Sequence, residues 1–287
     1  MVKGQENSFS YHLLKGWTGV CLTLPMILFI TVFLFYPLLR ILLLSLFDPN
    51  FTLKHYMALF QSSIYIKVLV MTLEISLIVT IRCLLLGYPV AYVISSVKGK
   101  WATWLMGMVV LCFWTSILVR TYSWMIILQR TGVINTFLLE LGLISKPLGL
   151  MYNLFGVTLG MIHVLLPYMV LPLYGVIEGI DRSLPRAAQN LGATPFKAFW
   201  KVFVPLSLPG VGAGCILVFV IALGFFITPA LLGGGKVIMI SNLIDSQVTQ
   251  LLNWGFASAI SLALIVVTLA IFFASNRYLG LAKMWGG

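Results

Sequence analysis

Two ionisable residues, Glu74 and Arg82, interrupt an otherwise apolar stretch at residues 68–97. Inside a membrane-spanning helix such side chains are costly, and they mark candidate sites for substrates or ions. On one helix the two would lie about 12 Å apart along the axis, too far to pair directly. Glu74 could therefore line a path for a cation. Alternatively, it bonds nearby polar groups such as Thr72 or Ser76, or it lies near the outer membrane interface.

Three aromatic residues, Trp114, Tyr122 and Trp124, could present ring faces to the same path. Ring faces attract organic cations through cation–π interactions. Aromatic residues at the ends of membrane spans more often serve as interfacial anchors, and that alternative stays open for all three. Together with Glu74 they form the candidate translocation path.

No residue pattern predicts catalysis by this chain. A nucleotide-binding P-loop requires Gly-Lys followed by serine or threonine, but both Gly-Lys pairs, at Gly99 and Gly235, precede an apolar residue. The three histidines are dispersed, and the four cysteines lie in apolar stretches without C-x-x-C spacing, which indicates neither a metal site nor a disulfide framework. We expect no catalytic residue, no metal and no cofactor on this polypeptide.

The elements that must position these residues are membrane helices. Of the 287 residues, 61% are hydrophobic and 9% are charged, and the mean hydropathy is +1.06, whereas soluble domains carry about a quarter charged residues. A chain this apolar must expose side chains to lipid. The net charge of +11 does not indicate nucleic-acid binding, because the basic residues form no run of five or more.

Six stretches are long enough to cross a hydrocarbon core about 30 Å thick, which takes about 20 residues of helix. They are continuous apolar runs without the alternation of a β-barrel, which predicts helices. Two G-x-x-x-G spacings, Gly156–Gly160 and Gly175–Gly179, favour close helix packing. We predict an all-α membrane protein with six transmembrane helices. The six stretches are residues 16–39, 68–97, 101–119, 147–177, 202–235 and 246–276.

Lysine and arginine are distributed unevenly between the two sides of this six-span topology. Ten lie on the side of both termini and seven on the other, and Arg82 lies within a span. The positive-inside rule therefore favours cytoplasmic termini and a cytoplasmic location for residues 178–201. The first stretch is interpreted as a retained helix, because it is longer than the roughly 7–15 apolar residues of a cleaved signal peptide.

The segment at 178–205, hereafter the bracket, differs from the other loops. Pro185 followed by Arg-Ala-Ala-Gln-Asn-Leu predicts a short helix that Gly192 ends. Thr194 and Pro195 predict the N-cap and first residue of a second helix, which continues amphipathically into the fifth span. The apolar side of that helix comprises Phe196, Phe199 and Val202. Two short helices that meet at a glycine suit a mechanical lever.

The spacing within the bracket resembles the cytoplasmic signature of permease subunits of binding-protein-dependent ABC importers. That signature is Glu-Ala-Ala, three residues, Gly, nine residues, then Ile-x-Leu-Pro. One departure is Arg186, which stands where the family usually has glutamate. The resemblance implies that the bracket docks on an ATPase. The residues that it assigns to this coupling are Arg186, Ala187, Ala188, Gly192, Ala193, Val202 and Pro205.

Flanking segments are similar, within that family, to the permease subunits of spermidine/putrescine (polyamine) importers. The resemblance implies a type I importer permease fold of six transmembrane helices, in the bacterial inner membrane, that works by alternating access. It also implies a second homologous permease, two copies of a cytoplasmic ATPase that hold ATP and magnesium, and a periplasmic or extracellular solute-binding protein. The similar segments are Leu86–Tyr92, Arg120–Trp124, Leu165–Tyr174, Thr228–Gly234 and Asn253–Ala257.

Other solutes remain as alternatives within the importer class, namely opines, 4-aminobutyrate, aminoethylphosphonate and ferric iron. A membrane scaffold without transport is the alternative from a different class. Under the importer interpretation the chain divides into a cytoplasmic tail at 1–15, a peripheral first transmembrane helix at 16–46 and a transport core at 64–280. The coupling-helix segment at 178–205 lies within that core.

Overall fold

The computed structural model describes residues 17–47 and 50–279, so the predicted tail at 1–15 lies outside the described residues. Throughout these two ranges the chain forms helices and turns, and the only β-type pairing there is an isolated bridge between Phe47 and Phe51. The prediction of an all-α fold is therefore confirmed.

Among the residues that the structure describes, five helical segments are long and apolar enough to cross a membrane, and a bent pair of helices makes a sixth crossing when counted as one span. The first crossing is a continuous helix with a π-helical turn in its middle, and it packs through its second half on the last helix. The five segments are α2 to α3 (α2 Trp17–Ile30, η1 Thr31–Phe35, α3 Tyr36–Leu46), α5 (Ser63–Ser96), α9 (Leu154–Glu178), α12 (Val204–Leu223, preceded by α11, Pro195–Ala198, and η2, Phe199–Phe203) and α15 (Trp254–Leu279).

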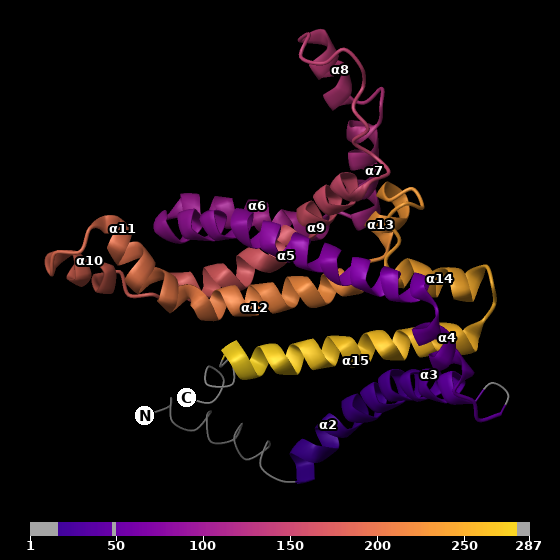
Figure 1. Cartoon of the computed structure of the whole chain (residues 1–287). Helices are drawn as coiled ribbons and strands as arrows, with labels where there is room; N and C mark the ends of the chain where they lie inside the picture. The colour runs from indigo at the N-terminus through magenta and orange to yellow at the C-terminus, as the bar shows by residue number, and fades with distance from the viewer. Residues whose placement is uncertain (1–16, 48–49, 280–287) are drawn as a thin grey trace.

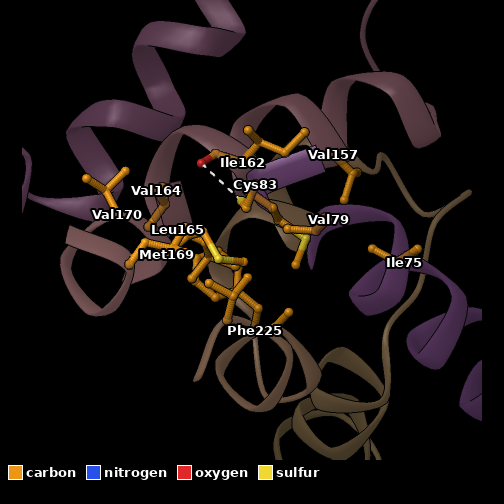
Figure 2. Close-up of a cluster of buried hydrophobic side chains, with 14 of the residues drawn as sticks. Ile75, Val79, Cys83, Val157, Ile162, Val164, Leu165, Met169, Val170 and Phe225 are labelled. Carbon is orange, nitrogen blue, oxygen red and sulfur yellow. Dashed lines mark hydrogen bonds between the residues drawn. The ribbon is translucent and has the colours of Figure 1, made fainter. Parts of the chain in front are cut away.

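The core of the bundle forms where α5, α9 and α12 pack on one another. Figure 2 shows its side chains, which include Ile75, Val79 and Cys83 of α5 against Leu165 and Met169 of α9. All five are at most 1% exposed. The Cys83 thiol lies 3.9 Å from the main-chain oxygen of Ile162. These three helices form the buried core to which the shorter segments attach.

Two glycines of α12, Gly210 and Gly214, bring α12 against α9. A Cβ atom at Gly214 would lie 2.7 Å from the sulfur of Met169, and one at Gly210 would lie 2.9 Å from Val176. Of the G-x-x-x-G spacings predicted to form close contacts, Gly160 does so, against Thr228 and Leu232. Gly175 does not, because a Cβ there would meet nothing within 4 Å. Small residues let helix backbones approach in this way.

We predict that Gly214→Val destabilises the bundle by about 1–3 kcal/mol, because overpacking forces neighbouring side chains and backbone to shift. The main-chain oxygen of Met169, 3.2 Å from the added Cβ, cannot move aside as a side chain does. Thermal unfolding of the detergent-solubilised protein measures the effect. Gly107→Val is the matched control in α6 (Lys100–Trp114), since a Cβ there meets nothing within 4 Å. Equal melting temperatures of the two variants would contradict the prediction.

The span predicted at 101–119 is broken by a bend near its end. Helix α6 (Lys100–Trp114) ends before Thr115, and α7 (Ile117–Leu128) and α8 (Val133–Glu140) continue at an angle of 95° to it. Figure 1 shows α7 and α8 as an arm that projects away from the bundle. The break is stabilised by Arg120, whose Nη2 donates to the main-chain oxygen of Thr115 over 3.2 Å. Irregular backbone at membrane depth is tolerated where such side chains bond the freed backbone groups.

A second break divides the stretch predicted at 202–235, because α12 ends at Leu223 and the short α13 (Ile227–Leu232) follows. Side chains of the next helix, α14 (Ile240–Thr249), bond the carbonyl oxygens freed at this break. The Ser241 hydroxyl donates to Phe225 over 2.6 Å, and the Asn242 amide donates to Phe226 over 3.1 Å. Because residues up to Thr249 belong to α14, the last span begins at Trp254 rather than at the predicted residue 246.

Candidate functional site

The bracket folds as its local sequence predicts. Helix α10 (Ser183–Asn190) is followed by Gly192, whose φ of +90° is a left-handed conformation that glycine adopts without strain. Helix α11 (Pro195–Ala198) is capped by Thr194, whose hydroxyl accepts a hydrogen bond from the main-chain nitrogen of Lys197 over 3.3 Å. A π-helical turn, η2 (Phe199–Phe203), joins α11 to α12. Figure 1 shows the bracket at the end of the bundle remote from α13 and α14.

The first helix of the bracket is preceded by an acidic cap. The carboxylate of Asp181 accepts a hydrogen bond from the main-chain nitrogen of Ser183 over 2.8 Å. This hydrogen bond to the charged form holds the pKa of Asp181 below its ordinary value. A negative charge at the start of a helix also complements the helix dipole.

The residues that the sequence assigns to coupling lie along the bracket in two groups. Arg186, Ala187, Gly192 and Pro205 are exposed, whereas the other three, Ala188, Ala193 and Val202, are partly buried. Pro205 lies in the first turn of α12, where a missing N–H costs nothing.

Apolar side chains form an exposed surface on the bracket. Leu191 is 90% exposed, Phe196 71% and Trp200 55%. Phe196, on the predicted apolar side, is thus exposed, and the side chains buried on this segment are Ala198 and Phe203. An apolar and basic surface of this kind fits the docking of another protein.

Arg182 ties the bracket to the end of α5, and sequence reasoning did not find it. Its Nη2 donates to the main-chain oxygen of Ser95 over 3.2 Å and to the Ser95 hydroxyl over 2.9 Å. The guanidinium carbon also lies 5.2 Å from the ring centroid of Phe203 and 5.8 Å from that of Tyr92, within the range of cation–π attraction. Because Ser95 is 87 positions away, no local pattern distinguishes Arg182 from Arg186.

An aromatic cluster continues this link into the membrane helices. The Phe199 ring stacks on Phe203 with centroids 5.6 Å apart, and Tyr92 packs edge-on against both. Next to them the Tyr88 hydroxyl hydrogen-bonds Ser207 of α12 over 2.8 Å. A displacement of the bracket would thus be transmitted to α5 and α12 through packed rings and hydrogen bonds.

The candidate translocation residues do not converge on one site. Glu74 is exposed on α5, and neither suggested partner binds it, since Thr72 bonds Val68 and Ile240 and the Ser76 hydroxyl has no partner among the described residues. Trp114 is 85% exposed at the end of α6, and Tyr122 is 52% exposed on α7.

Trp124 and Arg82 have polar partners on α9. The Trp124 indole donates to Nδ1 of His163 over 3.1 Å, and Arg82 donates to the Thr158 hydroxyl over 3.0 Å. Within residues 17–47 and 50–279 there is no group of three metal-ligating side chains.

Comparison with known proteins gives consistent results. Residues 83–280 match the family described as binding-protein-dependent transport system inner membrane component. The chain is 40% identical, over 79% of its own length and 79% of the relative's, to the spermidine/putrescine transport system permease protein PotB of Haemophilus influenzae. It is 38% identical to PotB of Escherichia coli, over 80% of this chain and 84% of that protein.

Solved structures resemble the chain in fold. A bacterial ABC transporter involved in the import of alginate superimposes with a TM-score of 0.73 and 21% identity, covering 95% of this chain and 98% of that one. The same TM-score, at 22% identity, is found for an alginate ABC transporter in complex with a periplasmic protein that binds an alginate pentasaccharide. The prediction of an ABC importer permease fold is confirmed by these matches.

Proposed function

This chain belongs to the family of binding-protein-dependent transport system inner membrane components, and on that premise we propose that it forms half of the translocation pathway of a polyamine importer. The assignment of a polyamine substrate rests on the sequence identity of 38–40% to spermidine/putrescine permeases over about four fifths of the chain. The chain is a multi-pass membrane protein and a transporter subunit.

The remaining parts of the machine are proposed partners. A second homologous permease would complete the pathway, two copies of a cytoplasmic ATPase would bind ATP and magnesium, and a solute-binding protein would deliver the substrate outside. With both termini cytoplasmic, the exposed side chains of the bracket face the ATPase, among them Arg186, Leu191 and Phe196. Closure of the ATPases on ATP would push the bracket, and the aromatic cluster would carry the movement to α5 and α12. The translocation pathway would then alternate between inward-facing and outward-facing openings, as the packed helices rearrange between two states.

The test is reconstitution of the complete complex in proteoliposomes with its solute-binding protein. We expect ATPase activity that spermidine or putrescine stimulates only when the binding protein is present, together with uptake of the labelled polyamine. Opines, 4-aminobutyrate, aminoethylphosphonate and ferric iron serve as competing solutes. Stimulation by one of these and not by a polyamine would overturn the substrate, and uptake of every solute without this chain would overturn the transport role.

A further inference from the structure

Two adjoining cavities lie where the bracket meets the membrane helices. The first, of 640 Å³, lies between the bracket and the end of α5, and Lys98, Arg182 and Arg186 are among the residues that line it. The second, of 720 Å³, continues between the ends of α5 and α9 and the side of α6. Both are lined by Ser95, Lys98 and Glu178. Because they share these residues, the two are one continuous space, hereafter the basic cavity.

A groove along α6 extends the basic cavity into the membrane. The groove has a volume of 540 Å³, runs from Lys100 to Trp114, and shares Thr103, Gly107 and Val110 with the basic cavity. Apart from Lys100 and Thr103 its lining is apolar. Figure 1 shows α6 running from the bracket end of the bundle towards α7. Its 15 residues rise about 22 Å, which exceeds the roughly 15 Å depth of one leaflet, half of the hydrocarbon core.

The basic cavity carries an excess of positive charge that a ligand can reach. Three cations line it, and Lys100 adds a fourth where the groove begins. In the part of the chain that the structure describes, Glu178 is the only acidic residue among the lining residues of the cavity and the groove. Lys98, Lys100 and Arg186 are exposed. The cavity therefore attracts an anion and repels a cationic solute such as a polyamine.

The apolar groove decides which kind of anion fits. A free phosphate ion would fill part of the cavity and leave the groove empty, whereas a molecule with an anionic head and an apolar chain matches both. At the start of α6, Trp101 is 73% exposed and Trp104 is 69% exposed. Exposed tryptophans at the end of a span are typical of the level of the lipid headgroups. Basic pockets between membrane helices at that level bind the headgroups of anionic lipids.

We propose that the basic cavity and the α6 groove bind one anionic phospholipid, with its phosphate between Lys98, Lys100 and Arg186 and an acyl chain along α6 past Gly107. Arg186 belongs to the bracket and Lys98 follows α5, so the headgroup joins the bracket to the membrane helices. The proposal goes beyond the proposed function. It needs only that the chain lies in a membrane, and it does not depend on the substrate.

The experiment measures quenching of tryptophan fluorescence in the detergent-solubilised full chain by phospholipids with brominated acyl chains. Brominated phosphatidylglycerol should quench at a lower lipid fraction than brominated phosphatidylcholine, which reports contact without charge selection. Lys98→Gln/Lys100→Gln should weaken this preference about 25-fold, since each basic residue near an anionic headgroup contributes about a fivefold factor. Lys197→Gln/Lys201→Gln is the matched control, because both lysines are exposed on the bracket but do not line the cavity. It should retain the preference.

A second pair of variants tests the groove without changing any charge. A Cβ at Gly107 meets nothing within 4 Å, so Gly107→Phe fills the groove without displacing the helix, and quenching by brominated phosphatidylglycerol should fall. Gly175→Phe on α9, where a Cβ also meets nothing within 4 Å, should quench as the wild type does. Trp104→Phe/Trp114→Phe should remove most of the quenching that is selective for phosphatidylglycerol, because both rings line the groove.

Four outcomes would overturn the proposal. Equal quenching by the two lipids would show that the cavity selects no anionic headgroup, and an unchanged preference in Lys98→Gln/Lys100→Gln would place the headgroup elsewhere. Loss of the preference on addition of inorganic phosphate would assign the cavity to a soluble anion. Loss of the selective quenching on assembly with the companion permease would assign the groove to that subunit. The measurements on the full chain use neither ATP nor a polyamine, so failure of the proposed function would leave them standing.

Discussion

An importer complex that carries Gly192→Val is expected to lose binding-protein-stimulated ATPase activity and uptake, although its membrane helices remain folded. Gly192 has a φ of +90° at the corner between α10 and α11. A Cβ there would meet nothing within 4 Å, so the penalty is one of backbone conformation alone. Strain of about 1–3 kcal/mol for a non-glycine residue lowers the population of the native corner by a factor of roughly 5 to 150.

Two variants separate conformation from bulk at this corner. Gly175→Val adds the same side chain on α9, where a Cβ also meets nothing within 4 Å, and it should transport normally. Gly192→Asn should retain most of the uptake, since asparagine tolerates the left-handed conformation. Proteoliposome uptake and stimulated ATPase activity measure all three. Full coupling by the Gly192→Val complex would show that the corner is not part of the lever.

The bracket could be predicted from sequence because its signals are local. Gly192 at a left-handed corner, Thr194 as N-cap and Pro195 in the first turn act through atoms a few residues away, and each residue type has one conformational reason to be there. The same holds for the long spans, whose apolar length alone predicts helices. The role of the bracket residues in coupling to an ATPase stays a prediction.

The breaks in the spans could not be predicted, because hydropathy measures length and not direction. Residues 101–119 carry no charge to mark a break, and the hydrogen bond from Arg120 to the main-chain oxygen of Thr115 is seen only in the folded chain. The close contact of Gly210 and Gly214 with α9 has the same three-residue spacing as Gly175–Gly179, which makes no such contact. Only the packing of helices distant in sequence distinguishes the two.

Removal of Arg182 is expected to disconnect the bracket from α5 while the bracket itself stays intact. Arg182→Met loses both hydrogen bonds to Ser95 and the cation–π contacts with Phe203 and Tyr92. Hydrogen bonds from a charged group contribute about 1.5–3 kcal/mol, so the attached arrangement should become roughly 10- to 150-fold less populated. A neighbouring cavity of 640 Å³ gives the freed bracket room to move. Uptake should fall accordingly, whereas ATP hydrolysis without the binding protein should persist.

Graded variants decide whether Arg182 acts through this attachment. Ser95→Ala removes only the hydroxyl acceptor and leaves the main-chain oxygen, so it should lower uptake less than Arg182→Met. Arg182→Lys keeps the charge but lacks the planar fork of donors, and it should fall between them. In the Ser95→Ala background, Arg182→Met should cost less than in the wild type, because coupled residues are not additive. If the two substitutions were instead additive, or if Arg182→Met lowered the melting temperature of the whole bundle, Arg182 would act as a general packing residue and not as the link between bracket and core.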